Sequence, residues 1–373
     1  MNILVFFTYK VSISDWEKAG ILDREFKLYE QMLRSTGINY SFITYGDTHD
    51  LNYNFNKLNI HPLYEKINYS KRSFVEFLNS LRILSVFKQE IKNCTIIKTN
   101  QLNGAWVGIL AKFIYKKKLI IRTGYDILYF SKMEKKSYLK IIFFDLLTNI
   151  SLKFSDCYIV SSESDKERLI LKYGPKYAVK IEVNANWVDY PNNVKPFSER
   201  DEEFISVGRL EKQKNYPNLL KSFMKKDLSI DIFGEGSEKK LLQKLIDEHD
   251  IQAKLKGKIK NTKLQTKYQD YKYFILNSHY EGNPKALLEA MAAGCVVLVR
   301  YHSNLRGIIT NKQNGFFYKS DEELEKKIIN LKNYDLEKIS GSARLYVHKN
   351  ITLEQHIEKE LQLYKNLVPG YSF

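Results

Sequence analysis

Cysteine, proline and histidine are scarce in this chain, which holds three, seven and seven of them among 373 residues. The cysteines, Cys94, Cys157 and Cys295, are scattered and form no Cys-x-x-Cys pair. This pattern argues against a disulfide framework and favours a reducing, cytoplasmic compartment. No apolar run reaches about 18 residues, which argues against a membrane-spanning helix. The opening MNILVFF lacks a small-residue cleavage site, so we interpret it as a first strand rather than a signal peptide.

Patterns that bind metals are missing as well. No two aspartates stand two positions apart, and the histidines form no cluster with the spacing of metal ligands. We therefore expect no bound divalent metal, and the sequence indicates no other cofactor.

Positive charge is abundant, with a formal net charge of +16 that both halves of the chain share. A protein this basic favours anionic partners, such as nucleic acid, a phospholipid surface or a phosphorylated small molecule. Heavy use of lysine, asparagine, isoleucine and tyrosine also fits a compositional bias without functional meaning.

The length exceeds what one hydrophobic core usually supports, so two domains are expected. Strands alternate with helical patterns in both halves, which predicts an α/β protein of two Rossmann-like, doubly wound domains facing across a cleft. We expect domains over 1–190 and 191–350, with 351–373 as a helix returning toward the first, and a linker within 189–203. The expected strands lie at 3–7, 39–45, 94–99, 118–122, 157–161, 180–184, 204–208, 228–233, 253–256, 273–276, 295–299 and 315–318. The clearest helical patterns lie at 24–36, 73–91, 103–116, 138–154 and 163–173.

The stretch HYEGNPKALLEAMAAGCVVLVR, residues 279–300, follows an expected strand and begins a helix. Pro284 suits the first turn of that helix and Gly294 its end. Its first backbone N–H groups have no partner in the helix, so this end favours an anion such as a phosphate. Glu281 precedes the helix and Glu289 lies inside it, and a carboxylate can accept hydrogen bonds from two neighbouring sugar hydroxyls. In the alternative interpretation, Glu281 caps the helix and Glu289 is a solvated residue on its polar face.

The same stretch resembles the E-x7-E signature of retaining GT-B glycosyltransferases, in particular family GT4. Further segments are similar to motifs of that family: ISVGRLEKQKNYPNLLKSF (205–223), IDIFGEGSEKKLLQKLI (230–246), KLKGKIKN (254–261) and VNANWVDYPN (183–192). The resemblance implies a GT-B fold and a metal-independent transfer, with retention of configuration, of a hexose from a nucleotide sugar that is UDP-linked in most relatives. It implies a glycan or polyprenyl-linked acceptor in surface polysaccharide biosynthesis.

The resemblance also implies roles for individual residues of the second half. Arg209 and Lys214 would stabilise the charge of the leaving diphosphate, Glu289 would bind the ribose, and Glu281 would bind the sugar. The remaining predicted donor contacts are Gly282, Asn283, Pro284, Lys285, Ala286, Leu287, Gly234, Gly257 and Ile259. Of these, Gly234 would leave room for the nucleotide, and the turn of Gly257 and Ile259 would place main-chain groups against the base.

The acceptor site is expected in the first half. Gly20 stands in an apparent polar loop where the family often has a glycine-containing acceptor loop. Arg122, Tyr125 and Asp126 follow a strand where relatives often carry a His or Asp that faces the donor sugar. This chain has no histidine there, so Asp126 is the candidate for a catalytic contact and Arg122 is the second. A salt-bridged turn is the alternative interpretation.

Lysines interleave with aromatic residues between 112 and 140, which suits contact with an anionic membrane surface. The lysines include Lys116, Lys117, Lys118, Lys132, Lys135 and Lys136, and the aromatics Phe113, Tyr115, Tyr129, Phe130 and Tyr138. We therefore expect a cytoplasmic protein with possible peripheral contact at the inner face of the membrane. A solvated basic face is the alternative.

Two other functions remain open from the sequence. The glutamate pair could serve a sugar phosphorylase or a glycoside hydrolase as acid and base, although Arg209 and Lys214 would then have no purpose. The charge could serve a non-catalytic nucleic-acid-binding protein, but no zinc pattern, helix-turn-helix or aromatic RNA-binding motif supports that function, and we expect no nucleic-acid partner.

Overall fold

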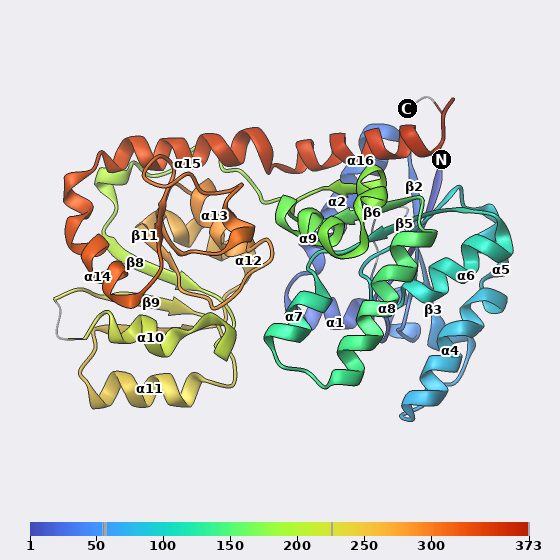
Figure 1. Cartoon of the computed structure of the whole chain (residues 1–373), viewed down its shortest axis with the longest axis horizontal. Coiled ribbons are helices and arrows are strands. Elements are labelled where there is room, and N and C mark those ends of the chain that lie inside the picture. Colours follow the sequence, from blue (N-terminus) through green and yellow to red (C-terminus); the bar gives the residue numbers. More distant parts are fainter. Residues whose placement is uncertain (54, 56–57, 225–226, 372–373) are drawn as a thin grey trace. The chain divides into compact units, whose positions relative to one another are not determined.

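The structure is a computed structural model that describes residues 1–53, 55, 58–224 and 227–371 (Figure 1). The chain divides into two compact units. Unit 1 comprises Met1–Ala185 and Ile357–Phe373, and unit 2 comprises Asn186–His356. Within the described residues, no helix is both long enough and apolar enough to cross a membrane.

Unit 1 is built on a seven-stranded sheet in the order β3-β2-β1-β4-β5-β6-β7, and every neighbouring pair is parallel. The strands are β1 (Asn2–Phe6), β2 (Asn39–Thr44), β3 (Asn59–Pro62), β4 (Ile96–Thr99), β5 (Lys118–Arg122), β6 (Cys157–Val160) and β7 (Ile181–Val183). The helices before unit 2 are α1 (Ile13–Ala19), α2 (Leu22–Thr36), α3 (Leu63–Lys66), α4 (Ser73–Val86), α5 (Lys88–Asn93), α6 (Ala105–Tyr115), α7 (Ile127–Met133), α8 (Tyr138–Phe154) and α9 (Glu163–Tyr173).

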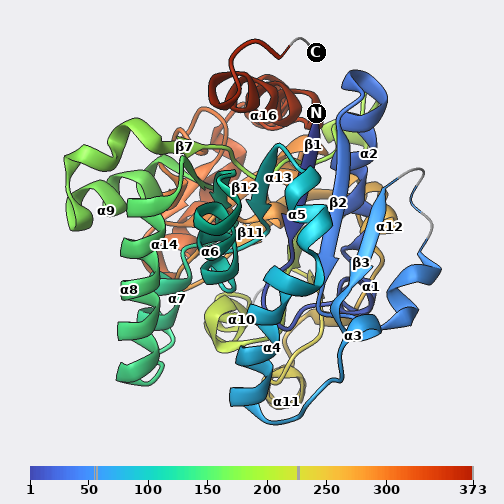
Figure 2. The same cartoon turned by 90° about the vertical axis from the view of Figure 1, so that its right-hand side faces the viewer.

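Helices cover both faces of this sheet, as expected for a parallel sheet buried on two sides (Figure 2). Apolar side chains of α4, α5, α6, α8 and α9 pack with the sheet in one core cluster. On the opposite face, Trp16 of α1 packs against Phe7, which follows β1, and Tyr29 of α2 packs against Phe42 of β2.

The last helix, α16 (Leu353–Leu367), belongs to unit 1 from Ile357 onward, and its Tyr364 lies on this second face beside Tyr40 of β2. Lys98 on the central strand β4 forms an ion pair with Glu360 of α16, and both side chains are almost fully buried. Tyr364 donates a hydrogen bond to the second carboxylate oxygen of Glu360 over 2.6 Å. The end of the chain therefore supplies a charge that the interior of unit 1 needs, because a buried ammonium without a partner is costly.

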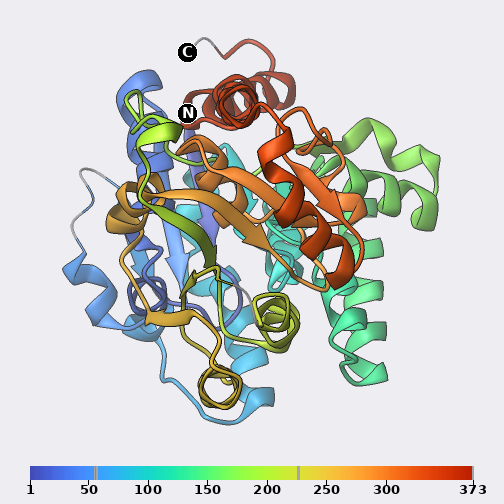
Figure 3. The ribbon, with the colours of Figure 1, turned by 90° about the vertical axis from the view of Figure 1, so that its left-hand side faces the viewer.

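Unit 2 is built on a six-stranded parallel sheet in the order β10-β9-β8-β11-β12-β13 (Figure 3). The strands are β8 (Glu202–Val207), β9 (Ile230–Phe233), β10 (Ala253–Gly257), β11 (Tyr271–Leu276), β12 (Val296–Arg300) and β13 (Phe316–Tyr318). The helices are α10 (Tyr216–Lys221), α11 (Lys239–Glu248), α12 (Asn261–Lys267), α13 (Lys285–Ala292), α14 (Asp321–Asn330) and α15 (Leu336–Asn350). Helices α10, α11 and α14 share one core cluster with the sheet. Helix α13 packs against α15 and against strands β11 and β12.

The predicted α/β class and the two doubly wound parallel sheets are confirmed, and each predicted strand has its counterpart. Strand β3 was not predicted, and the helical pattern over 73–91 divides at Phe87 into α4 and α5. The predicted polar loop around Gly20 is wrong. Residues Ile13–Ala19 form α1, whose start is closed by a capping box between Ser12 and Asp15. Gly20 is the C-cap of this helix, with a φ of 73° that favours glycine.

Candidate active site

Loops at the carboxyl ends of β8 and β9 meet in unit 2. The Gly208 N–H donates to the Phe233 carbonyl over 3.0 Å, and the Leu210 N–H donates to the Glu235 carbonyl over 2.9 Å. A Cβ on Gly234, whose φ is 151°, would lie 1.9 Å from the Gly208 carbonyl oxygen. A Cβ on Gly236 would lie 2.4 Å from the Leu210 carbonyl oxygen. The close approach of two backbone turns thus explains both glycines. The prediction from the sequence was instead that Gly234 leaves room for the nucleotide.

The turn after β10 joins the same edge of the sheet. The Gly257 carbonyl accepts a hydrogen bond from the Gly234 N–H over 2.9 Å, and Gly257 has a φ of 72°. Ile259, two residues further on, is half-buried. The structure therefore gathers three of the predicted donor contacts, Gly234, Gly257 and Ile259, on neighbouring loops.

A part-buried ion pair joins the loop after β11 to the turn after β8. Lys214 Nζ lies 2.6 Å from Glu281 Oε1, and the side chains of Lys214 and Glu281 are 16% and 5% exposed. Gln213 fastens the two loops further, because its carbonyl accepts from the His279 N–H and its side chain donates to the Tyr280 carbonyl. The sequence separately predicted Lys214 for the diphosphate and Glu281 for the sugar, and the structure places these two side chains in contact.

Arg209 lies on the same turn as Lys214 but is exposed. Its carbonyl accepts from the Glu211 N–H over 2.8 Å, and the Glu211 carbonyl accepts from the Lys214 N–H over 2.8 Å. The backbone therefore holds the two predicted cations on one short turn, one at the surface and one beside Glu281.

Helix α13 begins at the end of the β11 loop without a side-chain cap. Gly282, Asn283 and Pro284, the residues before it, are buried. Asn283 is anchored, since its side-chain oxygen accepts from the Asn186 N–H and its carbonyl accepts from the Asn186 side chain, both over 3.2 Å. The start of a helix carries the positive end of the helix dipole and therefore favours an anion. Of the predicted contacts in its first turn, Lys285 and Ala286 are half-buried and Leu287 is buried.

Glu289 is only 5% exposed, so the alternative of a solvated glutamate is wrong. Asn261, the first residue of α12, donates to Glu289 Oε1 over 3.0 Å. Gln265 donates in turn to Asn261 Oδ1 over 3.4 Å and to Asp189 over 2.9 Å. Burial, and secondly the charge of Glu289, raise the pKa of the nearby Tyr268 hydroxyl well above its ordinary value.

Sequence reasoning missed Asn261, Gln265 and Gln213. Asn261 follows the β10 loop, so the rule that functional side chains gather at the carboxyl ends of parallel strands could have found it. No comparable signal marks Gln213, because its role depends on a loop that is 67 residues away in the sequence.

His302, which follows β12, was likewise not singled out. Its Nε2 lies 2.6 Å from the Ser278 carbonyl oxygen, so the neutral ring carries its proton on Nε2 and donates it there. Burial lowers the pKa of His302, and the Ser278 carbonyl and Glu281 oppose that effect in part. His302 therefore supports the β11 loop from the side of β12.

The predicted acceptor residues Arg122, Tyr125 and Asp126 lie in unit 1, at the carboxyl end of β5 and the start of α7. The Asp126 carboxylate caps α7 by accepting from the Tyr129 N–H over 3.0 Å, and it lies 3.7 Å from Arg168 Nε. Asp126 therefore caps a helix and lies beside Arg168, which is the geometry expected for the alternative interpretation, a salt-bridged turn.

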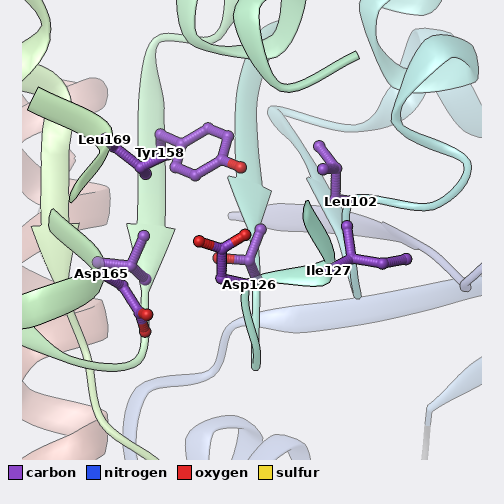
Figure 4. A pocket seen from close by; sticks show the side chains of 8 residues that line it. Leu102, Asp126, Ile127, Tyr158, Asp165 and Leu169 are labelled. Atoms are coloured by element: carbon purple, nitrogen blue, oxygen red, sulfur yellow. The ribbon is translucent and has the colours of Figure 1, made fainter. Parts of the chain in front are cut away.

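Asp126 also lines a small recess (Figure 4). The recess is lined by Leu102, Thr123, Asp126, Ile127, Tyr158, Val160, Asp165 and Leu169. Beside it, Tyr125 is 39% exposed and Arg122 is half-buried. Gly20 lies elsewhere in the sequence of unit 1, at the end of α1.

Over the described ranges, with their gaps at 54, 56–57, 225–226 and 372–373, no three His, Cys, Asp or Glu side chains are grouped so that they could hold a metal ion. The positive groups beside Glu281 and Glu289 are Lys214 and the start of α13.

Comparison with known proteins identifies the segment that carries this site. Residues 192–344 match the model of the family Glycosyl transferases group 1. The chain is 30% identical over 142 residues to an alpha-monoglucosyldiacylglycerol synthase of Acholeplasma laidlawii, a match that covers 36% of each protein. It is 29% identical over 184 residues to an N-acetylgalactosamine-N,N'-diacetylbacillosaminyl-diphospho-undecaprenol 4-alpha-N-acetylgalactosaminyltransferase of Campylobacter jejuni, which covers 45% of this chain and 48% of that enzyme. The matches thus span about a third to a half of these relatives.

Among solved structures, HepE of Anabaena in complex with UDP superimposes with a TM-score of 0.76 at 14% identity, covering 98% of this chain and 100% of that one. This likeness establishes the fold as GT-B, the fold that the sequence predicted.

Proposed function

We propose that this chain, whose residues 192–344 match the model of the family Glycosyl transferases group 1, transfers a hexose from a nucleotide sugar to a glycan or lipid-linked acceptor. The observation that carries the proposal is the Lys214–Glu281 ion pair of 2.6 Å, next to the uncapped start of α13 in unit 2. UDP is the proposed nucleotide, and the complex of UDP with HepE, a protein of the same fold, supports this choice.

The proposed donor site combines cationic and anionic groups. Arg209, Lys214 and the main-chain N–H groups at the start of α13 bind the diphosphate, Glu289 binds the ribose hydroxyls and Glu281 binds the sugar. Asn261 holds Glu289 through its 3.0 Å hydrogen bond, which fixes the position of the carboxylate. No metal is required in this proposal, because two cationic side chains and a helix start supply the positive charge.

The reaction forms one glycosidic bond and breaks another. An acceptor hydroxyl attacks the anomeric carbon on the face that the diphosphate leaves, and the bond between that carbon and the phosphate oxygen breaks. The hydroxyl proton passes to the departing phosphate, so the products are a glycoside and a nucleoside diphosphate. Negative charge grows on the leaving group as the bond breaks, and Arg209 and Lys214 stabilise it selectively in the transition state.

The acceptor residues are proposed in unit 1, with Asp126 as the first candidate for a catalytic contact and Arg122, Tyr125 and Gly20 around the acceptor. The names of the two relatives describe transfer to a diacylglycerol lipid and to a diphospho-undecaprenol-linked sugar, and they support a lipid-linked acceptor here.

The proposal is tested by calorimetric titration of the protein with UDP-hexoses and by the acceptor-dependent release of UDP. Lys214→Ala should lower the rate of transfer by about 100-fold or more, as expected when a group that stabilises transition-state charge is removed. Lys212→Ala is the matched control, because Lys212 lies on the same turn but is exposed. Absence of binding for every nucleotide sugar, or an equal loss in both variants, would contradict the proposal. Transfer that survives chelation with EDTA would support metal independence.

A further inference from the structure

Helices α4, α6 and α8 of unit 1 are neighbours (Figure 2). Apolar side chains on one surface of these helices are exposed. Phe74 on α4 is 72% exposed, and Tyr138 and Leu139 on α8 are 75% and 79% exposed. We name this surface the apolar face. It consists of Phe74, Phe77, Leu78, Trp106, Tyr138, Leu139, Ile142 and Phe143, of which all but the half-buried Trp106 are exposed.

The apolar face is continuous across the three helices. Trp106 on α6 stands between Phe77 on α4, at a ring distance of 5.7 Å, and Phe143 on α8, at 6.1 Å. The Trp106 Nε1–H donates to Ser80 Oγ over 3.0 Å, which fixes the ring in the middle of the row. Contiguous exposed aromatic and aliphatic groups of this kind mark a surface that binds a protein, a membrane or a ligand.

Cations lie at one end of the apolar face. Lys71 and Arg72 precede α4, while Lys132, Lys135 and Lys136 precede α8, and Lys140 lies in its first turn; all six are exposed. Helices α4 and α8 begin at the same end of unit 1 (Figures 1 and 2), so both groups of cations lie at that end.

The acidic side chains nearby are already engaged. Glu134 pairs with Lys136 over 2.8 Å, and Asp145 pairs with Lys172. Glu76 of α4 is buried and accepts hydrogen bonds from Ser70 N and the Asn79 side chain. With Lys136 paired to Glu134, the other five cations leave a positive charge at this end of the apolar face.

This surface shares its residues from 132 to 140 with the one that the sequence predicted over 112–140, but it does not include the lysines at 112–118. Lys112 pairs with Asp156 over 2.7 Å, and Lys117 Nζ donates to the carbonyls of Lys92 and Cys94. Tyr115 hydrogen-bonds the Leu84 carbonyl, so its hydroxyl is also occupied. Lys116 and Lys118 follow the last residue of α6, whereas Trp106 lies in its first turn. The lysines at 116–118 are therefore at the other end of α6 from the apolar face.

We propose that the apolar face docks unit 1 on an anionic phospholipid bilayer. The aromatic and aliphatic side chains enter the boundary between headgroups and acyl chains, and the lysines bind the phosphates around them. A second copy of the chain fits less well as the occupant, because two such faces would bring their cations together.

Sedimentation with phospholipid vesicles tests the proposal and needs neither donor nor acceptor, so its outcome is independent of the proposed transferase activity. The protein should sediment with vesicles containing phosphatidylglycerol and remain in solution with vesicles of phosphatidylcholine alone. The triple variant Lys132→Gln, Lys135→Gln, Lys140→Gln should bind about 100-fold more weakly, since each lysine near an anionic surface contributes about fivefold. The triple variant Lys27→Gln, Lys88→Gln, Lys176→Gln changes the net charge equally at exposed positions elsewhere in unit 1 and should bind like the parent.

The apolar contribution has its own pair of variants. Phe74→Gln with Leu139→Gln should abolish vesicle binding, whereas Leu171→Gln with Val179→Gln, at positions 89% and 87% exposed on another part of unit 1, should not. All of these positions are at the surface, and unchanged circular dichroism shows that a variant is folded. The proposal is overturned if the parent protein does not bind anionic vesicles, or if a control variant loses as much vesicle binding as its counterpart. It is also overturned if sedimentation equilibrium without lipid shows a dimer that the Phe74/Leu139 variant abolishes.

Discussion

Glu281 and Glu289 are both buried in unit 2, but different groups compensate their burial. Glu281 has an ammonium at 2.6 Å, whereas Glu289 has the amide of Asn261 at 3.0 Å. A buried carboxylate needs such a partner because desolvation alone would cost several kcal/mol. Any anion that draws Lys214 toward itself therefore also weakens the hold on Glu281. This coupling links the proposed diphosphate position to the proposed sugar position through one side chain.

The buried His302 leads us to predict that the stability of the folded protein depends on pH. Its pKa in the folded protein is lowered from the ordinary value of 6.5, chiefly by burial, so the unfolded chain binds the proton more readily. The contribution of His302 to stability is therefore fully present above pH 6.5 and decreases as the pH falls from 6.5 through the lowered pKa. His302→Gln removes this titration. We expect the free energy of unfolding, measured with urea, to fall more between pH 7.5 and 5.5 in the parent than in the variant. A parallel fall in both proteins would contradict the prediction.

At the scale of elements, the turns after β8 and β9 depend on two glycines. Gly234→Ala and Gly236→Ala place a Cβ 1.9 Å and 2.4 Å from backbone carbonyl oxygens, and backbone cannot move aside as a side chain can. Each substitution should lower the free energy of unfolding by about 1–3 kcal/mol or more, the usual cost of forced overpacking. Because Arg209 lies on the displaced turn, donor affinity measured by calorimetry should fall as well.

Gly341→Ala provides the control for these variants. Gly341 lies in the interior of α15, is exposed, and a Cβ there meets no other atom within 4 Å. Alanine at this position should stabilise the protein by up to about 1 kcal/mol through helix propensity. Equal effects at positions 234 and 341 would show that close packing of the two turns is not what these glycines provide.

A helix or strand was predictable from the sequence where its apolar residues follow a regular pattern and a residue such as proline or glycine marks its end. Strand β12 is a fully buried Val-Val-Leu-Val run, and α13 lies between Pro284 and Gly294, so the unit of strand, loop and helix could be placed closely. Strand β3 has the sequence NIHP, too short and too polar for a strand pattern, and α1 has only seven residues. Their structure depends on neighbours, as when β3 completes the edge of the sheet by pairing with β2.

The candidate site, too, was predictable only in part. Glu281 and Glu289 were found because they flank and occupy a helix start that the pattern reveals, whereas the roles of Arg209 and Lys214 came from the family resemblance. Their mutual contacts were not found, since the Lys214–Glu281 pair joins residues 67 positions apart and depends on how the loops fold.

At the scale of the whole molecule, Lys98 and Glu360 join residues 262 positions apart inside unit 1. Removing one partner leaves the other charge buried without compensation, so Glu360→Leu should lower the free energy of unfolding by about 3–5 kcal/mol. Lys98→Met should act similarly, and the double variant should regain most of that loss because no buried charge remains.

Urea unfolding of the two single variants and the double variant measures this coupling. Lys66→Ala is a suitable control, because it removes a surface pair with Glu65 in the same unit and should change stability by less than about 1 kcal/mol. Additive losses in the double variant would show that Lys98 and Glu360 act independently of each other.

The position of Glu360 in the sequence also determines when unit 1 can finish folding during translation. The sheet of unit 1 is made from the first half of the message, yet the carboxylate that neutralises Lys98 is translated only after all of unit 2. A nascent chain halted before α16 must hold an uncompensated lysine in the middle of its sheet or keep that sheet open. Stalled-chain proteolysis should therefore find the amino-terminal half sensitive until the final helix has left the exit tunnel.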